Sequence, residues 1–351
     1  MIPSFGKLPS GKRLSRIKAS NNYRHGAFQN VYDTPMLSPD ASYTKMLGKF
    51  FFGSSDGQEP RQLLPSVRTD LKMISRDEPS LTWFGHSSYL ITLNGKIILV
   101  DPVFSLRASP FQNIGSKSFQ MTNPYTVDYL PDPDLLIITH DHYDHLDYNT
   151  ITRLSSGVPR IATSLGVGAH LESWGVDSNK IREFDWWEGA QILPGLELTA
   201  MPSRHFSGRV FKRNQTIWSS FLLEGGGMKV FVGGDSGYDG TFARIGEKTG
   251  GIDFAILECG QYDMMWPNIH MMPEETVQAG VDLRAKAMMA VHWGKFRLAN
   301  HPWSDPIDRA TTEALRLKAP LITPQIGERI RIDNPAKHTS QWWRQRTNAG
   351  L

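Results

Sequence analysis

Short apolar runs separated by turn residues follow one another along the chain from Leu81 onward. Leu81–Gly85, Tyr89–Leu93 and Lys96–Asp101 have the length of β-strands, and the turn dipeptide Asn94–Gly95 joins the last two as a hairpin. Further runs of this kind then alternate with stretches in which apolar residues recur at helical spacing. The expected strands are Leu135–Ile138, Arg160–Thr163, Leu196–Met201, Ser219–Leu223, Lys229–Val232, Phe254–Glu258 and Ala287–Val291, and the expected helices are Leu165–Trp174, Pro273–Ala285 and Asp308–Ala319.

This order of elements favours an α/β fold. Hairpin strands followed by alternating strands and helices predict two mixed sheets packed face to face with helices on the outer faces, an αββα sandwich. The sequence contains no linker that would mark a second domain of this kind.

The first part of the chain has a different pattern. Residues 1–35 are polar and basic with little periodicity, which favours an extended arm on the domain surface; residues 1–30 contain six Lys or Arg and no Asp or Glu. Ser38–Gly53 follows with apolar residues at helical spacing, Ser38 as a candidate N-cap and Pro39 at the first helical position. The apolar face of this predicted helix consists of Tyr43, Met46, Leu47, Phe50 and Phe51.

An amphipathic helix of this composition has two interpretations. It can dock on the domain core, or it can lie in a membrane interface together with the basic arm. In both cases we expect an N-terminal extension, residues 1–80, packed on a main domain that comprises residues 81–351 and ends in a C-terminal tail.

Composition narrows the class of protein. The chain has 351 residues, of which 40% are hydrophobic and 21% charged, so it can bury a core. A formal charge of +3 is small for this length and predicts no nucleic-acid partner. Cys259 is the single cysteine, so any metal site must use His and carboxylate ligands. No apolar run is long enough to span a membrane, and the first ten residues lack the apolar segment of a signal peptide, so we expect a soluble or peripheral membrane protein of the cytoplasm or periplasm. The sequence carries no signal of oligomeric state.

The stretch "THDHYDHLD" directly follows the expected strand Leu135–Ile138. His140 and His142 stand two apart, so an extended backbone points both imidazoles to the same side, and Asp144 and His145 follow where the chain turns. A polar loop after a buried strand would also explain these residues. The spacing nevertheless favours two metal ions side by side over a single ion.

Three further residues have the same context. His205, Asp235 and His292 each come at or just after the C-terminal end of an expected strand, the edge at which sheet proteins gather their sites. Taken singly, each has a simpler explanation as a hydrogen-bonded core histidine or a turn aspartate. Together with the first motif they supply enough ligands for two ions that share a carboxylate and a water.

These motifs resemble those of the metallo-β-lactamase fold over residues 80–325. Within that superfamily, "TWFGHSSYLI", "ILVDPVFS", "THDHYDHLD", "RHFSGR", "GGDSGY", "HMMPEE" and "VHWGKF" are similar to the N-acyl phosphatidylethanolamine-hydrolysing phospholipase D group and its bacterial RomA-like and lactonase-like relatives. The resemblance implies a zinc hydrolase with two Zn²⁺ per chain. It further implies a phosphodiesterase of phospholipase D type that acts on related phospholipids through a metal-bridging hydroxide.

The resemblance also implies a role for each candidate residue. His140, His142 and His205 would hold the first zinc, Asp144, His145 and His292 the second, and Asp235 would bridge both. Asp101 would orient a ligand histidine or its loop; otherwise it is a turn aspartate before Pro102.

Other residues are candidates for catalysis and substrate binding. Asp144 and His270 are the catalytic candidates, and His270 could contact phosphate or protonate the leaving oxygen, or instead be a surface or capping histidine. Arg209 could neutralise a phosphate oxygen, unless it is an ordinary surface arginine. His86 lies at a strand-to-strand turn that borders the site in this fold. Asn268 is the amide side chain nearest to His270; the animal phospholipase differs at the intervening Ile269, so contacts to a lipid head group would differ.

Two alternative functions remain open. The first is a lactonase or other ester hydrolase of small metabolites, including phosphorylated ones, because the same hydroxide can attack a carbonyl carbon. The second is a metal-binding, membrane-associated interaction protein without turnover, against which the intact ligand set argues.

Overall fold

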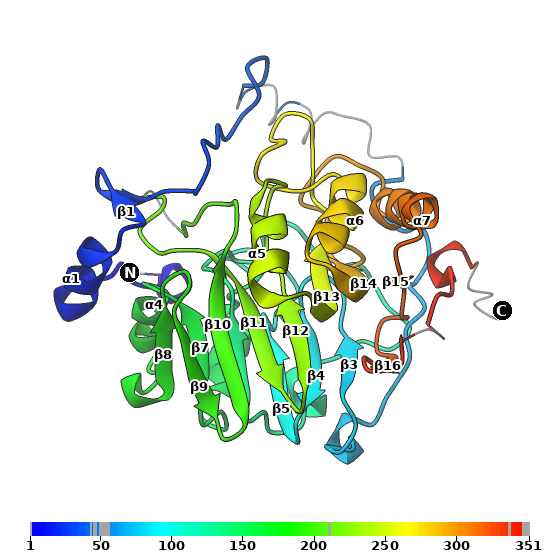
Figure 1. Ribbon diagram of the computed structural model, residues 1–351, viewed down its shortest axis with the longest axis horizontal. Helices are drawn as coiled ribbons and strands as arrows, with labels where there is room; N and C mark the ends of the chain where they lie inside the picture. Colours follow the sequence, from blue (N-terminus) through cyan, green and yellow to red (C-terminus); the bar gives the residue numbers. More distant parts are fainter. Residues whose placement is uncertain are drawn as a thin grey trace.

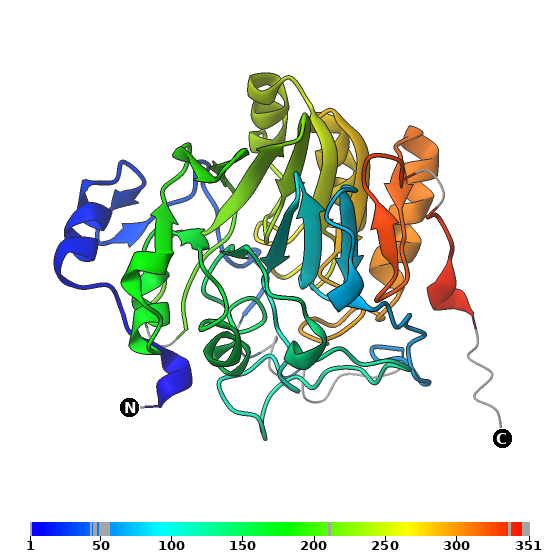
Figure 2. The ribbon, with the colours of Figure 1, turned by 90° about the horizontal axis from the view of Figure 1, so that it is seen from below.

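The computed structural model describes residues 2–42, 44, 48, 57–209, 212–335 and 338–345. Within these residues two seven-stranded sheets pack face to face, and helices cover their outer faces (Figures 1 and 2). The αββα sandwich expected from the strand and helix pattern is therefore confirmed.

The first sheet is antiparallel at one end and parallel at the other. Strands β3, β4 and β5 form a meander, and β5 to β8 run parallel. The order across the sheet is β16 (Arg329–Arg331), β3 (Ser80–Trp83), β4 (Tyr89–Leu93), β5 (Lys96–Val100), β6 (Leu135–Ile138), β7 (Ile161–Ser164) and β8 (Ile181–Phe184).

The second sheet is mixed in the same way. Strands β9 to β12 pair antiparallel, and β12 to β15 pair parallel. The order is β15 (Leu321–Ile322), β14 (Ala285–Val291), β13 (Ile252–Glu258), β12 (Met228–Val232), β11 (Ser219–Gly225), β10 (Leu196–Pro202) and β9 (Gly189–Leu193).

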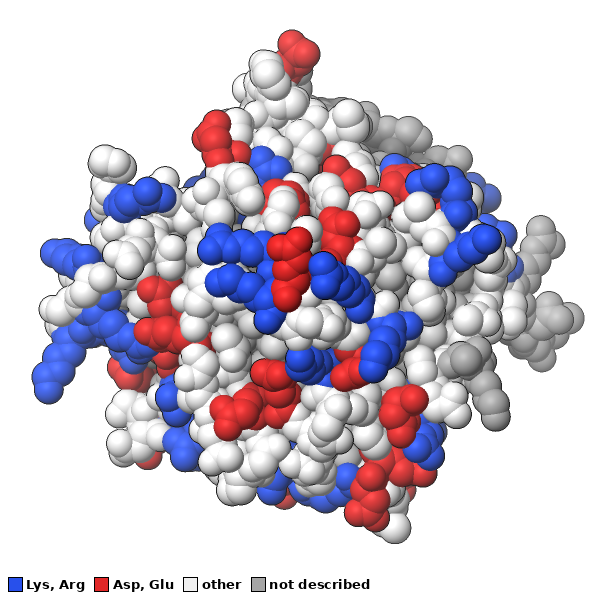
Figure 3. All heavy atoms as spheres, viewed as in Figure 1, with Lys and Arg blue, Asp and Glu red and all other residues white. Residues whose placement is uncertain are grey.

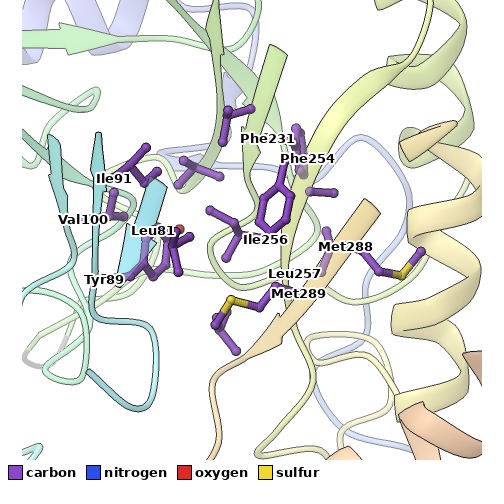
Figure 4. Close-up of a cluster of buried hydrophobic side chains, with 14 of the residues drawn as sticks. Leu81, Tyr89, Ile91, Val100, Phe231, Phe254, Ile256, Leu257, Met288 and Met289 are labelled. Atoms are coloured by element: carbon purple, nitrogen blue, oxygen red, sulfur yellow. The ribbon is translucent and has the colours of Figure 1, made fainter. Parts of the chain in front are cut away.

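The main core lies between the two sheets. Successive residues of a strand point to opposite faces, so Ile98 of β5 enters the inter-sheet core while Leu99 packs under the helices on the outer face. Both faces are covered, which explains why these strands are continuous apolar runs and do not alternate with polar residues. Figure 4 shows Ile91 from the first sheet and Ile256 and Met289 from the second within this core.

Two groups of helices cover the outer faces. On the first sheet lie α3 (Tyr148–Leu154) and α4 (Gly168–Ser173), and on the second lie α5 (Thr241–Thr249), α6 (Pro273–Asp282) and α7 (Asp305–Leu317) (Figure 1). Short 3₁₀ turns occur at Pro3–Phe5, Leu71–Met73, Val127–Tyr129, Ser178–Lys180 and Trp342–Arg344. α6 begins as the sequence predicts, because Pro273 occupies the first turn and Glu275 accepts a hydrogen bond from the Met272 N–H at 2.8 Å.

The N-terminal arm is not extended throughout, contrary to the expectation for residues 1–35. It forms α1 (Gly11–Ala19) and a hairpin of β1 (Tyr23–Arg24) and β2 (Ala27–Phe28). α1 has one buried side chain, Ile17, so the sequence carries no apolar stripe that would reveal the helix. Arg13 attaches α1 to the main domain through ion pairs of 2.7 Å with Glu172 and with Glu183.

Charge is distributed unevenly over this arm and the domain. In Figure 3, Lys and Arg gather at the edge where Figure 1 places α1, whereas positive and negative side chains are interspersed over the centre of the same face. The absence of a nucleic-acid partner stays a prediction.

The predicted helix over Ser38–Gly53 lies largely outside the described residues. Ser38 itself is described, and its backbone N–H donates to the Met265 carbonyl at 2.9 Å. The boundary between an N-terminal extension and a main domain at residues 80 and 81 stays a prediction. Among the described residues, no helix is long and apolar enough to cross a membrane.

Candidate metal centre

The predicted ligands lie in loops that follow four strands. The loop with His140 to His145 follows β6 of the first sheet, and His205, Asp235 and His292 follow β10, β12 and β14 of the second. β10 and β12 are both antiparallel to β11 and therefore run in the same direction, and β14 is parallel to the β12–β13 pair. Their C-terminal ends thus share one edge of the sandwich, where the sequence predicts the site.

One group of possible ligands consists of His140, His142, His205 and Asp235. Their ligand atoms all lie within 4.8 Å of one another. Nε2 of His140 is 3.0 Å from Nδ1 of His142 and 3.7 Å from Oδ2 of Asp235. Nε2 of His205 is 3.6 Å from the same Asp235 oxygen. The set matches the three histidines and the shared carboxylate expected for the first ion.

A second group lies on the other side of Asp235 and contains Asp144, His145, His292 and also His86. Nε2 of His145 is 3.1 Å from Oδ1 of Asp235, and Nδ1 of His292 is 3.2 Å from that oxygen. Asp235 therefore presents one oxygen to each group. This is the geometry required of a bridging carboxylate.

The side chains at the centre fit bound cations because several of their ligand atoms lack a hydrogen-bond partner among the described residues. Neither oxygen of Asp235 has a hydrogen bond of acceptable geometry among the described residues, and the same is true of Nε2 of His145 and of His292. Asp235 is only 3% exposed. A buried carboxylate without donors is costly, and imidazole and carboxylate groups are the ligands of zinc and related divalent ions.

Two of these histidines, His145 and His205, make a hydrogen bond to the protein through Nδ1. His145 Nδ1–H donates to Oδ2 of Asp101 at 2.8 Å, and Asp101 also accepts from the Thr139 backbone N–H at 2.8 Å. His205 Nδ1–H donates to the Ile269 carbonyl at 2.8 Å. Partners of this kind fix the ring orientation and leave the opposite nitrogen for a metal. Asp101 thus occupies the place that a ligand-orienting aspartate requires.

Burial and charge oppose each other at this centre. Burial alone would raise the pKa of Asp235, but the surrounding imidazoles, above all His145 and His292, outweigh it and hold that pKa well below its usual range. Burial, together with the neighbouring His145, holds the pKa of His140 well below that of a free imidazole. Asp235 is therefore ionised and His140 neutral at neutral pH, the forms that bind a metal.

The β-lactamase superfamily domain model matches residues 96–293. The chain belongs to the β-lactamase superfamily. It is 37% identical to an uncharacterized protein of Mycobacterium tuberculosis over 330 residues, which are 93% of this chain and 88% of that protein. It is also 31% identical to the N-acyl-phosphatidylethanolamine-hydrolyzing phospholipase D 1 of Caenorhabditis elegans over 229 residues, 61% of this chain and 64% of that protein.

A solved structure shows the same fold. The metallo hydrolase of the archaeon Ignicoccus hospitalis matches with a TM-score of 0.55 and 22% identity, over 72% of this chain and 97% of that chain. The resemblance noted from the motifs is confirmed, and the chain is a metal-dependent hydrolase of the superfamily.

The candidate metal centre opens into a cavity of about 250 Å³. His142, Asp144, Asp235, His270 and His292 form its polar floor. The remaining lining is mainly apolar and consists of Met36, Leu37, Phe206, Trp266, Ile269 and Leu298, with Arg213 and Gln261 between them. A ligand bound at the floor would therefore place its remaining atoms against apolar walls.

His270 lies beside the ligand histidines, and its ring stacks on that of His292 at 5.3 Å between centroids. Its Nδ1–H donates to Oε2 of Glu258 at 3.0 Å. Burial raises the pKa of Glu258 to about 7 although His270 opposes the shift. For His270 burial acts in the other direction, but the Glu258 carboxylate outweighs it and raises the pKa to about 9. The imidazole of His270 can therefore carry a second proton near neutral pH.

Arg209 requires a correction. It is neither an exposed arginine nor a residue of the cavity wall. Its guanidinium is buried under the metal loop, residues 139–147, which follows β6. It donates to the carbonyls of Asp141 at 2.7 Å and Leu146 at 2.8 Å, and also to that of Ser4 at 2.7 Å. These bonds connect the N-terminal segment to the metal loop, and Arg209 does not line the cavity beside the candidate ligands.

His86 and Asn268 are also placed differently from the expectation that they bind substrate. His86 is fully buried, and its Nε2 lies 2.9 Å from Oδ2 of Asp144, so it supports a ligand. The Asn268 amide donates to the Pro35 carbonyl at 3.0 Å and does not line the cavity. It connects the loop before α6 to the N-terminal extension.

Sequence reasoning missed Glu258 and Ser87. Glu258 ends β13, so it has the same signal as the predicted ligands, an acidic residue at the C-terminal end of an apolar strand. Ser87, whose Oγ is 2.8 Å from Nδ1 of His292, has no such signal, because serine is common in turns.

Proposed function

We propose that this chain is a zinc hydrolase with two Zn²⁺ ions, most specifically a phosphodiesterase of phospholipase D type that acts on N-acyl phosphatidylethanolamine-like or related phospholipids. The observation that carries the proposal is the bridging position of Asp235 between two groups of ligands at the floor of an apolar-walled cavity. The phospholipase D relative supports the phosphodiester class.

Two ions held by these ligands would lower the pKa of a shared water toward about 7 and neutralise charge on a phosphodiester. The chain's own residues would do the remaining work. The apolar walls would exclude water and receive the acyl chains, and His270, which lines the cavity, would protonate the leaving oxygen. A phosphodiester suits such a site because it offers one oxygen to each ion.

Substrate preference tests this proposal. Zinc-loaded protein should hydrolyse bis(p-nitrophenyl) phosphate faster than p-nitrophenyl phosphate or a β-lactam, and should release phosphatidic acid from N-acyl phosphatidylethanolamine as detected by mass spectrometry. A lactone panel assayed beside these substrates tests the alternative. Faster turnover of lactones than of every phosphodiester would replace the proposal with the ester hydrolase, and no turnover by metal-loaded protein would favour the non-catalytic interaction protein.

His270→Ala tests the proposed general acid. We expect kcat to fall by about 10²-fold on phosphodiesters with poor leaving groups, the usual contribution of a positioned acid. The loss should be much smaller for p-nitrophenolate, which leaves without a proton. Equal losses on both kinds of substrate would indicate that His270 binds the substrate and does not protonate the leaving group.

The membrane surface is the proposed partner. Met36 and Leu37 line the cavity and directly precede Ser38–Gly53, which supports a route from a lipid interface along this segment into the site. The basic arm would add attraction to anionic lipids.

A further inference from the structure

Glu258 is a fully buried carboxylate that none of the predicted metal roles uses. It is 0% exposed at the end of β13, between the strands that deliver Asp235 and His292. Oε1 accepts from the backbone N–H of Ser236 at 3.2 Å and of Met271 at 3.1 Å, and Oε2 accepts from Nδ1–H of His270 at 3.0 Å. Removing one partner from a buried, hydrogen-bonded charge of this kind is strongly destabilising.

These contacts give Glu258 a specific place in the site. Ser236 follows the bridging Asp235, and Met271 follows His270, so one oxygen holds the backbone beside both residues. His270 lies in the loop before α6, outside any helix or strand, so no regular backbone structure fixes its ring. Glu258 supplies the bond that does.

We propose that Glu258 is a positioning residue that holds His270 with Nδ1–H toward the carboxylate and Nε2 toward the cavity. The role in turnover rests on the proposed function, because it assumes that His270 protonates a leaving oxygen. Above about pH 7, where Glu258 is ionised, its carboxylate can only accept hydrogen bonds. Nδ1 of His270 is then the donor, and Nε2 is the nitrogen left for the substrate. The tautomer itself does not depend on the substrate.

Glu258→Gln changes this arrangement at a single group. If the amide oxygen keeps the two backbone N–H donors, the amide NH₂ faces Nδ1 of His270 and turns that nitrogen into an acceptor. His270 then loses the Nδ1 proton and keeps a proton on Nε2 alone. Glu258→Asp keeps an acceptor on a shorter side chain and should restore part of the native behaviour. Glu275→Gln, which alters the capping bond of α6 in the same region, is the matched control.

The first readout needs no activity. Nitrogen-15 correlation spectra of zinc-loaded protein, with His270→Ala for assignment, should show His270 protonated on Nδ1 in the native chain and in Glu275→Gln. Glu258→Gln should lose the Nδ1 proton while binding the same amount of zinc and melting as a folded protein. A native His270 protonated on Nε2 alone would overturn the proposal. Loss of zinc in both Glu258 variants would instead make Glu258 a metal ligand.

The second readout is kinetic and uses methyl phenyl phosphate and methyl p-nitrophenyl phosphate. Glu258→Gln should lower kcat about 10- to 100-fold on the phenyl ester with little change in KM, and much less on the p-nitrophenyl ester. The double variant with His270→Ala should be no slower than His270→Ala alone, because both changes remove one function. Multiplied losses in the double variant would show that Glu258 acts independently of His270. If His270→Ala itself shows no leaving-group dependence, the general-acid role fails while the tautomer result still decides the position of His270.

Discussion

At the scale of single residues, Lys295 is a buried lysine next to the candidate metal centre. It is 6% exposed, and its Nζ donates to the carbonyls of Val103 at 2.7 Å and Phe84 at 3.4 Å. Burial lowers its pKa to about 8, although the Asp147 carboxylate acts in the opposite direction. The ammonium therefore holds two loops at the edge of the first sheet at an energetic cost.

This shift gives a pH dependence of stability with a definite sign. Between about pH 8 and 10.4 the unfolded chain keeps the Lys295 proton while the folded chain has lost it, so the unfolded state binds more protons. The contribution of Lys295 to the free energy of unfolding must then rise with pH across that window. We expect the native chain to gain stability relative to Lys295→Met from pH 8 to pH 10, as measured by urea denaturation.

Lys286→Met, which removes a largely exposed lysine, controls for the change in net charge. A stability difference between the native chain and Lys295→Met that stays constant or shrinks as pH rises would contradict the assignment.

The role of a single residue could be predicted where the sequence around it forms a recognisable motif, and not where it depends on contacts with remote residues. His140, His142 and His145 were predicted because titratable residues rarely cluster behind an apolar strand without a reason. Arg209 was misjudged because the carbonyls that hold its guanidinium come from residues remote in sequence. Glu258 was predicted as the end of a strand, but its hydrogen bond to His270 depends on how the loop before α6 folds back.

At the scale of elements, the inner strands of both sheets were predicted well because both of their faces are buried, whereas the edge strands β8, β9, β15 and β16 were not predicted. β4 and β5 lie within the predicted ranges, and the ligand loops begin where the predicted strands end. α1, α3 and α5 were not predicted. α1 packs through Ile17 and is otherwise held by ion pairs. A helix that contacts the domain through charges leaves no apolar periodicity in the sequence.

The segment Ser38–Gly53 is the element with the largest proposed functional role. Under the membrane proposal its aromatic and cationic residues lie in a lipid interface. Phe50→Ser combined with Phe52→Ser should then reduce co-sedimentation with anionic vesicles and activity on vesicle substrate. Turnover of bis(p-nitrophenyl) phosphate should be unchanged.

If the segment instead docks on the core, the same double substitution should lower the melting temperature and reduce activity on vesicles and on the soluble substrate together. Undiminished vesicle binding by the double variant would show that lipid contacts another part of the molecule. Met73→Ser, at a side chain that is 81% exposed, controls for the loss of a surface apolar group.

At the scale of the whole molecule, the two sheets bring distant parts of the sequence to one edge. The first sheet contributes the metal loop after β6, and the second contributes the single ligands after β10, β12 and β14. Asp235 lies where these contributions meet, with one oxygen toward each group. The sandwich therefore assembles ligand groups that neither sheet holds alone, and the central claim proposed for this protein is that they bind two ions.

A zinc titration of chelator-treated protein tests that claim most directly. Bound metal should be measured by mass spectrometry in parallel with hydrolysis of bis(p-nitrophenyl) phosphate. We expect activity to rise until about two ions are bound per chain. Asp235→Asn, which removes the shared charge, should bind fewer ions and stay inactive. Full activity with one ion per chain, or two ions bound at an unchanged rate in Asp235→Asn, would contradict the account.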